Sequence, residues 1–153
     1  GSAALGFRIL DSGARVEGRE AFVSRWRRPP STLSLVKTLA RVATACIDVS
    51  DGCLQDLGHL CRASNVGAIV QSNALPLDSG FHTACLALGA EPFELALTGG
   101  EDYELLFTAP RSAEADSIAT AIGTTVESGG VRAVDADGAT LPISASGFRH
   151  FSS

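Results

Sequence analysis

The sequence lacks a long apolar run and a surplus of positive charge. Its apolar stretches are far shorter than the roughly 18–20 residues that a membrane-spanning helix needs, and no basic segment followed by an apolar one indicates a secretory signal. With 17 acidic against 12 basic side chains and an isoelectric point near 5.1, the chain does not have the basic surface that nucleic-acid binding requires. We therefore expect neither a membrane nor a nucleic-acid partner.

One basic cluster, Arg25-Trp26-Arg27-Arg28, is the exception to this acidic balance. Cations beside an aromatic ring suit contacts with a phosphate or a base. Basic residues in the last turn of a helix also compensate the negative end of its dipole, and Pro29-Pro30 would then end the helix. We favour the second interpretation.

The four cysteines lack the spacing of a metal or disulfide site. Cys46, Cys53, Cys61 and Cys85 include no Cys-x-x-Cys pair, so neither a zinc site nor a disulfide framework is indicated. Cys53 and Cys61 share one helical stripe with leucines. We expect buried free thiols and a reducing, cytoplasmic location.

Several nucleotide-binding and nucleophile motifs are absent as well. The sequence has no Gly-x-x-x-x-Gly-Lys-Ser/Thr loop, which excludes a P-loop kinase, and no Gly-rich dinucleotide fingerprint. Its three histidines, His59, His82 and His150, lie apart without a matching nucleophile motif.

What the sequence does contain is an irregular alternation of helix and strand patterns over 153 residues, a length that suits one compact domain. We expect residues 1–44 to be a helical lead-in, with helices at 3–10, 19–28 and 33–44, and residues 45–153 to be an α+β core. The core is expected to contain helices at 52–64, 79–88, 92–97 and 113–122, and strands at 45–49, 66–71, 103–109, 124–127, 131–134 and 140–143. This pattern predicts an α+β fold, a layered mixed β-sheet with packed helices.

The helix at 52–64 has the clearest pattern. Apolar residues at 53, 54, 57, 60 and 61 form one stripe. Gln55, Asp56, His59 and Arg62 are expected on the polar side, and Asn65 is a plausible left-handed stop.

A first candidate site lies where the strand at 45–49 meets this helix. Asp48 and Ser50 share one face of an extended segment, and Asp51 follows directly. Carboxylate oxygens at such a turn suit Mg²⁺, and free N–H groups at a helix start suit phosphate. A helix cap and a strand-end acid explain the same residues. From the spacing alone, this purely structural role is favoured.

A second candidate site is Thr98-Gly99-Gly100-Glu101-Asp102-Tyr103-Glu104. The glycine pair allows close backbone approach or a positive φ. Glu101 or Asp102 then has the chemistry to accept a ligand amine or help hold a metal, but a tight turn with solvated acids fits equally well. His59, Asp56 and Glu104 are lesser candidates. Near the end of the chain, Phe148 and Phe151 have the character of residues that dock into a core or stack on a planar ligand.

Together, these segments resemble the thiamine-monophosphate kinase family. The resemblance is carried by Ile-Asp-Val-Ser-Asp-Gly, Gln-Asp-Leu-Gly-His-Leu and Leu-Thr-Gly-Gly-Glu-Asp-Tyr-Glu-Leu-Leu-Phe-Thr, in this order, and by the closing Gly-Phe-Arg-His-Phe. It covers essentially the whole chain. It implies a fold similar to the C-terminal domain of aminoimidazole ribonucleotide synthetase, and an enzyme whose N-terminal, ATP-binding domain is absent from this chain.

The resemblance also implies an activity and roles for individual residues. Such enzymes use ATP, with Mg²⁺, to phosphorylate thiamine monophosphate to thiamine diphosphate. Asp48 and Asp51 would be Mg²⁺ ligands, and Ser50 would lie against the ATP phosphates. Because phosphoryl transfer depends on positioned cations more than on a covalent nucleophile, no catalytic side chain is assigned here.

The substrate end of the site is implied in the same way. Glu101, with Asp102 near it, would face the thiamine part, and Phe148 would stack on it or line its pocket. The family's N-terminal domains form a dimer, so a homodimer is a possible partner arrangement. The isolated chain is expected to be inactive.

The chain departs from the family in two places: the basic stretch at residues 25–30 lacks the usual His and Leu, and Cys53 replaces an aliphatic residue. Two other interpretations stay open. One is a related ATP-dependent synthetase domain, against which the string Gly99–Tyr103 argues. The other is a non-catalytic ligand-binding or assembly module.

Overall fold

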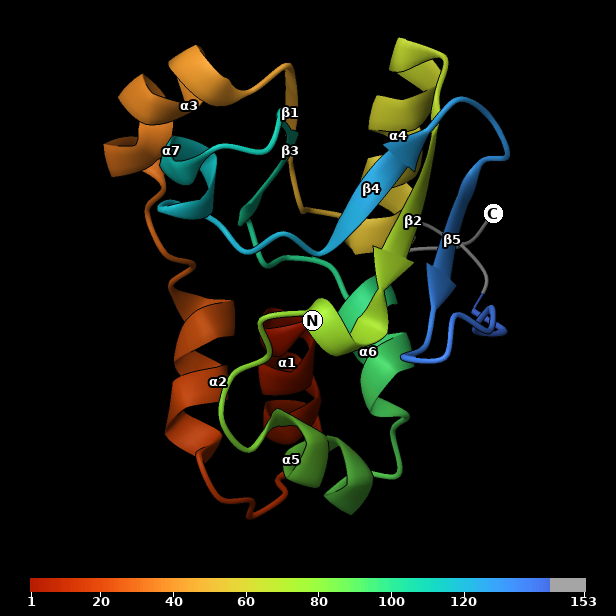
Figure 1. The fold of residues 1–153 in the computed structure, drawn as a ribbon. Coiled ribbons are helices and arrows are strands. Elements are labelled where there is room, and N and C mark those ends of the chain that lie inside the picture. The colour runs from red at the N-terminus through yellow and green to blue at the C-terminus, as the bar shows by residue number, and fades with distance from the viewer. Residues whose placement is uncertain (144–153) are drawn as a thin grey trace, which may run out of the picture.

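The computed structural model describes residues 1–143, and residues 144–153 lie outside the described part (Figure 1). Its helices are α1 (Ser2–Ser12), α2 (Arg19–Arg27), η1 (Leu33–Leu35), α3 (Val36–Val42), α4 (Cys53–Ser64), η2 (Ser72–Ala74), α5 (Phe81–Ala87), α6 (Pro92–Thr98) and α7 (Ala113–Asp116). Its strands are β1 (Ala45–Asp48), β2 (Gly67–Gln71), β3 (Leu105–Thr108), β4 (Gly123–Val126) and β5 (Val131–Val134). Within the described residues, no helix is both long and apolar enough to cross a membrane.

A three-stranded mixed sheet has the order β4-β2-β5. Strand β2 is antiparallel to β4, with Gly67 opposite Val126, and parallel to β5, with Ala68 opposite Val131. Helix α4 lies along this sheet, and their apolar side chains form one cluster (Figure 1). The predicted α+β fold with a mixed sheet is therefore confirmed.

A separate two-stranded antiparallel sheet pairs β1 with β3, with Asp48 opposite Leu105. Residues along β1 alternate between partly buried and exposed positions, as expected for a strand covered on one face. Asp48 is on the exposed face. The sheet ends at Asp48, and the chain continues directly into the first candidate site.

Helix α4 is the element that the sequence predicted best. It ends where expected, because Asn65 adopts the left-handed conformation (φ 55°, ψ 43°) and its N–H group donates to carbonyls of the last turn. The predicted apolar stripe is buried. One assignment was wrong: Asp56, expected on the polar side, is only 3% exposed.

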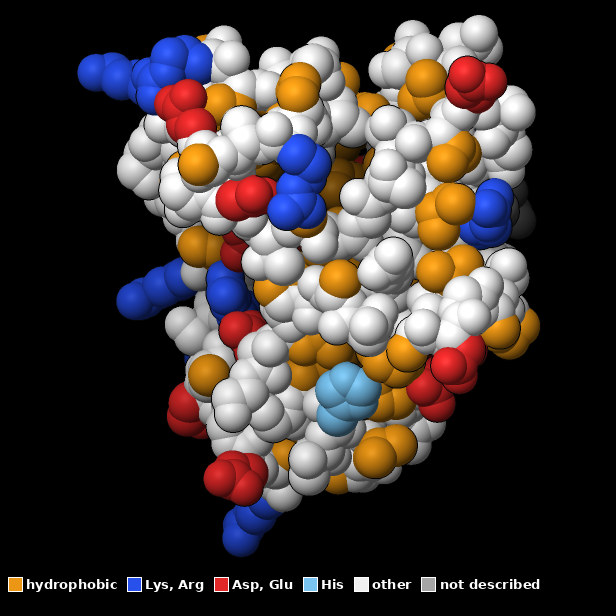
Figure 2. Space-filling model, viewed as in Figure 1, with side chains coloured by type: hydrophobic (Ala, Val, Ile, Leu, Met, Phe, Trp, Pro, Cys, Tyr) orange, Lys and Arg blue, Asp and Glu red, His pale blue; other side chains and the backbone are white. Residues whose placement is uncertain are grey.

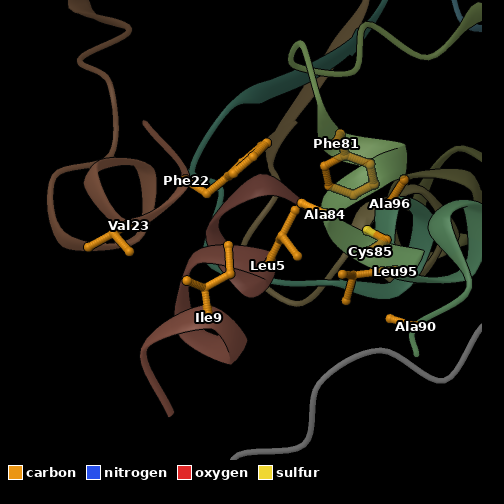
Figure 3. Packing of buried hydrophobic residues seen from close by; sticks show 10 residues of the cluster. All are labelled: Leu5, Ile9, Phe22, Val23, Phe81, Ala84, Cys85, Ala90, Leu95 and Ala96. Carbon is orange, nitrogen blue, oxygen red and sulfur yellow. The ribbon is translucent and has the colours of Figure 1, made fainter. Parts of the chain in front are cut away.

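The hydrophobic core consists of two clusters. The first joins α1, α2, α5 and α6, and Figure 3 shows the side chains of Leu5, Phe22, Phe81 and Cys85 meeting there. The second joins α4 to β2 and β5 and includes Leu97 of α6. Because α6 supplies residues to both clusters, the first two helices are built into the same packed body as the mixed sheet.

The cysteines are all free, as predicted, and three of them are buried. Burial raises the pKa of Cys53 and of Cys85 to about 11. Cys46 is the one cysteine that is not buried, because it lies on the exposed side of β1. A thiol with such a raised pKa is protonated at neutral pH and reacts slowly.

Several predicted elements are shorter than expected, including the strand predicted over 103–109, of which β3 contains only Leu105–Thr108. The helix predicted over 33–44 is divided into η1 and α3 and ends at Val42. It ends there because Ala43 is extended and the Thr44 N–H group already donates to the Thr108 carbonyl. The helix predicted over 113–122 contains only α7, which buries a single side chain and so has little tertiary packing to hold it. The strand predicted near 140–143 is reduced to one bridge, between Val134 and Thr140.

Candidate functional site

The two candidate sites, about 50 residues apart along the chain by the numbering, are joined by main-chain hydrogen bonds. The Glu101 N–H group donates to the Ser50 carbonyl at 2.8 Å, and Tyr103 N–H donates to the Val49 carbonyl at 2.9 Å. In return, Val49 N–H donates to the Glu104 carbonyl at 2.9 Å. These bonds extend the β1–β3 pairing, so the two motifs form two turns that lie side by side.

Glycine is required in this junction because two backbone segments touch. A Cβ atom on Gly100 would lie 2.4 Å from the Ser50 carbonyl oxygen, and one on Gly52 would lie 2.5 Å from the Thr98 carbonyl oxygen. Of the two possibilities offered for the Gly99-Gly100 pair, close approach is therefore the one that the structure shows. Neither Gly99 nor Gly100 has a positive φ, and the positive φ angles of the junction are those of Gly52 (116°), Glu101 (66°) and Tyr103 (51°). Side chains rarely adopt this conformation, which is typical of functional turns.

Asp56 holds the first turn in shape. Its buried carboxylate accepts the N–H groups of Ser50 at 3.0 Å, Asp51 at 3.0 Å and Gly52 at 3.2 Å. Burial raises the pKa of Asp56, the three N–H groups partly oppose that shift, and the nearby Asp51 charge adds to it. Since these three N–H groups point at Asp56, a phosphate bound here would contact the N–H groups of the first turn of α4 or side chains such as that of Ser50 instead.

Asp48 and Asp51 provide carboxylates beside this turn. Asp48 is exposed, and Asp51 accepts a hydrogen bond from the Gln55 side-chain amide at 3.2 Å. Across residues 1–143, no group of three or more His, Cys, Asp or Glu side chains is arranged to hold a metal. Two carboxylates are the hard oxygen donors that Mg²⁺ accepts, but its remaining ligands would have to be water or phosphate. Their role as metal ligands stays a prediction.

Helix α2 brings two side chains to the second turn. The Trp26 indole N–H donates to the Glu101 carboxylate at 3.1 Å. Arg25 donates to Glu104 at 2.9 Å and to Asp78 at 3.4 Å. Burial lowers the pKa of Arg25, but the two acids outweigh it, so its pKa is raised overall.

The predicted helix end at Arg25–Arg28 is confirmed, since α2 ends at Arg27. Sequence reasoning nevertheless missed the contacts of Arg25 and Trp26 with the second turn. The available signal was an aromatic residue inside the basic cluster. Nothing in the local pattern showed which acids it would meet.

Asp102 is used differently from Glu101. Its carboxylate accepts the Ala3 N–H group at 2.9 Å and also contacts the Gly1 nitrogen. Both partners are at the start of α1, so Asp102 caps that helix. The predicted contact of Asp102 with the substrate stays a prediction. Phe148, predicted to contact the substrate as well, lies outside the described residues.

A hollow of about 310 Å³ adjoins Asp78, the second partner of Arg25. Its lining is mixed: Ser72, Asn73, Leu75, Leu77, Asp78, Gly80, Phe81, His82, Thr83 and Phe93. Figure 2 shows hydrophobic side chains gathered around a histidine on this part of the surface, over α5 and α6. The sequence did not indicate this hollow, whose lining combines the stretch of residues 72–83 with Phe93 of α6.

Comparison with known proteins adds independent information. No protein-family model matches the chain. A curated thiamine-monophosphate kinase of Aquifex aeolicus is 41% identical over 91 residues, which are 60% of this chain and 30% of that protein. The solved structure of AaThiL complexed with AMPPCP and TMP matches 98% of this chain and 48% of its own, with a TM-score of 0.80 and 32% identity. Curated proteins of Haemophilus influenzae and Escherichia coli, 40% and 36% identical to the chain, are thiamine-monophosphate kinases as well.

The resemblance inferred from the two motifs is thereby confirmed, and the chain is similar to the C-terminal part of a thiamine-monophosphate kinase. It spans about a third of the length of the curated thiamine-monophosphate kinases that it matches, 30% and 34% for two of them. The structure of Escherichia coli HypE aligns with 99% of this chain at a TM-score of 0.76, but with 20% identity it shares the fold alone.

Proposed function

We propose that residues 1–153 are a single C-terminal domain that forms the substrate side of a thiamine-monophosphate kinase. The complete enzyme would transfer a phosphoryl group from ATP to thiamine monophosphate and produce thiamine diphosphate. The observation that supports this most is the main-chain bonding of Val49 and Ser50 to the Glu101–Glu104 turn, which sets an acidic, metal-suited turn beside a second turn suited to the cationic end of the substrate. The relative described above was solved with AMPPCP, an ATP analogue, and with TMP.

Each predicted residue has a place in this proposal. Asp48 and Asp51 would hold Mg²⁺, and Ser50 would lie against the ATP phosphates. Bound Mg²⁺ would neutralise charge between two polyanionic substrates, which is the main requirement of phosphoryl transfer. Asp56 keeps the loop that carries these groups in shape, and the exposed position of Asp48 leaves it open to a ligand.

The thiamine part of the substrate would contact Glu101, with Asp102 and Phe148 contributing at its edges. An ATP-binding N-terminal domain would supply the remaining metal ligands, so this chain alone should not catalyse the reaction. We also propose a homodimer in the complete enzyme and a cytoplasmic location.

The test is titration calorimetry of the 153-residue chain with thiamine monophosphate, together with an assay of thiamine diphosphate formation. We expect binding without turnover, and we expect Glu101→Gln to weaken binding by roughly tenfold through loss of one charged partner. Glu94→Gln is the matched control, because Glu94 is an exposed acid on α6. Absence of binding, or equal loss in the control, would contradict the proposed substrate role, and turnover by this chain alone would contradict the division between two domains.

An assembly module is the second candidate function. Leu33 and Val36, on η1 and α3, are 80% and 52% exposed, and neighbouring exposed apolar side chains favour an interface. Size-exclusion chromatography across a range of concentrations separates the two candidates. A dimer that disappears in Leu33→Ser, with no affinity for thiamine monophosphate, would favour assembly as the main role.

A further inference from the structure

Trp26 is the only tryptophan in the chain, and its surroundings are unusual for a residue at the end of a helix. Its indole N–H donates to the Glu101 carboxylate at 3.1 Å, across two elements far apart in sequence. The centroids of the Trp26 ring and of the Phe7 ring on α1 are 5.5 Å apart, and the ring planes form an angle of 46°. Two aromatic rings and one carboxylate therefore meet at the surface where α1, α2 and the Glu101 turn converge.

Glu101 is held at two points, its backbone N–H group and its carboxylate. Its backbone has a φ of 66° and its N–H group is bonded to Ser50, so the direction of its side chain is set by the turn. The indole N–H then sets the position of the carboxylate itself. Arg25, the residue before Trp26, binds Glu104 and Asp78 and so secures the end of α2 against the same turn.

The charge of this cluster favours a cation. Glu101, Glu104 and Asp78 carry three carboxylates, whereas Arg25 supplies the only cation in these contacts among the described residues. Arg25 is directed at Glu104 and Asp78, which leaves Glu101 paired with a neutral donor. Phe7 is 47% exposed, so part of the aromatic surface is open to solvent. Aromatic faces attract cations, and a flat cation also gains contact area by stacking on a ring.

We propose that Trp26 is a positioning residue that holds the Glu101 carboxylate and, with Phe7, forms a recognition element for a planar cationic ring. This rests on the proposed function, in which that ring is the thiazolium of thiamine monophosphate. Specificity then has two sources: the carboxylate selects positive charge, and the aromatic pair selects a flat ring. The Trp26 ring and its N–H group have separable parts in this recognition.

The hydrogen bond can be tested without any ligand. Because the chain has one tryptophan, a ¹H–¹⁵N spectrum contains a single indole resonance. We expect Glu101→Gln to move this resonance and to speed its exchange with solvent. Glu104→Gln is the matched control, since Glu104 binds Arg25 and not Trp26, and it should leave the resonance nearly unchanged. Equal effects of the two variants, or none from Glu101→Gln, would overturn the positioning role.

Recognition of the cation is tested by a double-mutant cycle on thiamine monophosphate binding. Trp26→Phe keeps an aromatic ring and removes the donor, so it should weaken binding by roughly three- to tenfold. In the Trp26→Phe/Glu101→Gln double variant, the loss should be smaller than the product of the two single losses, because both remove the same interaction. A neutral thiophene analogue should bind the wild type more weakly than thiamine monophosphate does. In Trp26→Leu, the difference in affinity between these two ligands should be smaller.

The outcomes separate this inference from the proposed function. If thiamine monophosphate binds, and Glu101→Gln weakens it while Trp26→Phe does not, the recognition element is wrong and the proposed function stands. Independent, multiplicative losses in the double variant would also overturn it. If thiamine monophosphate does not bind the wild type, the proposed substrate role and the recognition of this cation both fail, while the spectrum still decides whether Trp26 positions Glu101.

Discussion

At the scale of single residues, Asp56 shows how a buried charge can serve a surface loop. Its carboxylate is 3% exposed and accepts three backbone N–H groups. Each of these groups would otherwise be left without a partner at the start of α4, and an unsatisfied N–H group costs about 1–3 kcal/mol. The benefit is opposed by the desolvation of the charge, which is the main reason why the pKa of Asp56 is raised.

This balance predicts a particular pH dependence. A carboxyl group whose pKa is raised by folding binds its proton more tightly in the folded than in the unfolded chain. Its contribution to the free energy of unfolding is therefore largest at low pH and is lost as the pH rises through the pKa of the folded state. Asp56→Asn keeps an acceptor and does not titrate. We expect the stability of the wild type relative to Asp56→Asn to fall as the pH rises from about 3 towards neutrality, measured by urea unfolding. A relative stability that rises with pH would show that the three N–H groups dominate.

At the scale of elements, the site depends on close contact between one turn and another. The Gly100 turn packs on the Ser50 carbonyl, whereas Gly58, inside α4, has only the end of the Arg62 side chain nearby, 3.2 Å from a built Cβ atom. Neither glycine has a positive φ. The same substitution at the two positions therefore separates steric contact from helix propensity.

We expect Gly100→Ala to destabilise the chain by about 1–3 kcal/mol, because its Cβ atom would clash with backbone that cannot move aside cheaply. Gly58→Ala should be neutral or stabilising by up to about 1 kcal/mol, since alanine favours the helix and Arg62 can shift. Urea unfolding of both variants measures this. A neutral Gly100→Ala would mean that the two turns are not in the contact described.

Helix length at this scale follows packing more than propensity. α4 has a full apolar stripe and reaches its predicted end, whereas α7 buries only Ala115 and stops after one turn. Short helices are marginal without a buried face. The same reasoning explains why α5 and α6 are stable at seven residues each: both contribute to the core.

At the scale of the whole molecule, the two hydrophobic clusters are linked through α6. Leu95 and Ala96 belong to one cluster and Leu97 to the other. A linked core predicts one cooperative transition. Trp26 is on α2, a helix that contributes Phe22 and Val23 to the first cluster, so its fluorescence reports on that part. Circular dichroism reports on all helices and strands.

We expect the two signals to coincide during urea unfolding. Phe22→Ala removes a fully buried ring whose centroid lies 6.3 Å from that of Phe81. It should lower the free energy of unfolding by about 3–5 kcal/mol and shift both signals equally. Leu86→Ala, at an exposed position on α5, is the control and should change stability by less than about 0.5 kcal/mol. Separate transitions would show that the helices of the first cluster fold independently of the mixed sheet.

Features that depend on neighbours along the chain could be predicted from the amino-acid sequence. The apolar stripe and the Asn65 stop of α4, the α+β class with its mixed sheet and the free thiols follow from residue types and their spacing, and the family was inferred from the resemblance of two motifs. The folded arrangement was needed to show that the Glu101 turn bonds to Ser50, that Asp56 is buried, that Asp102 caps α1 and that Trp26 binds Glu101. Most of these contacts join residues far apart in the chain, and Asp56 turns inward because of the loop that it supports. The contacts of Glu101, Asp102 and Trp26 depend on how elements pack together, which no local period encodes.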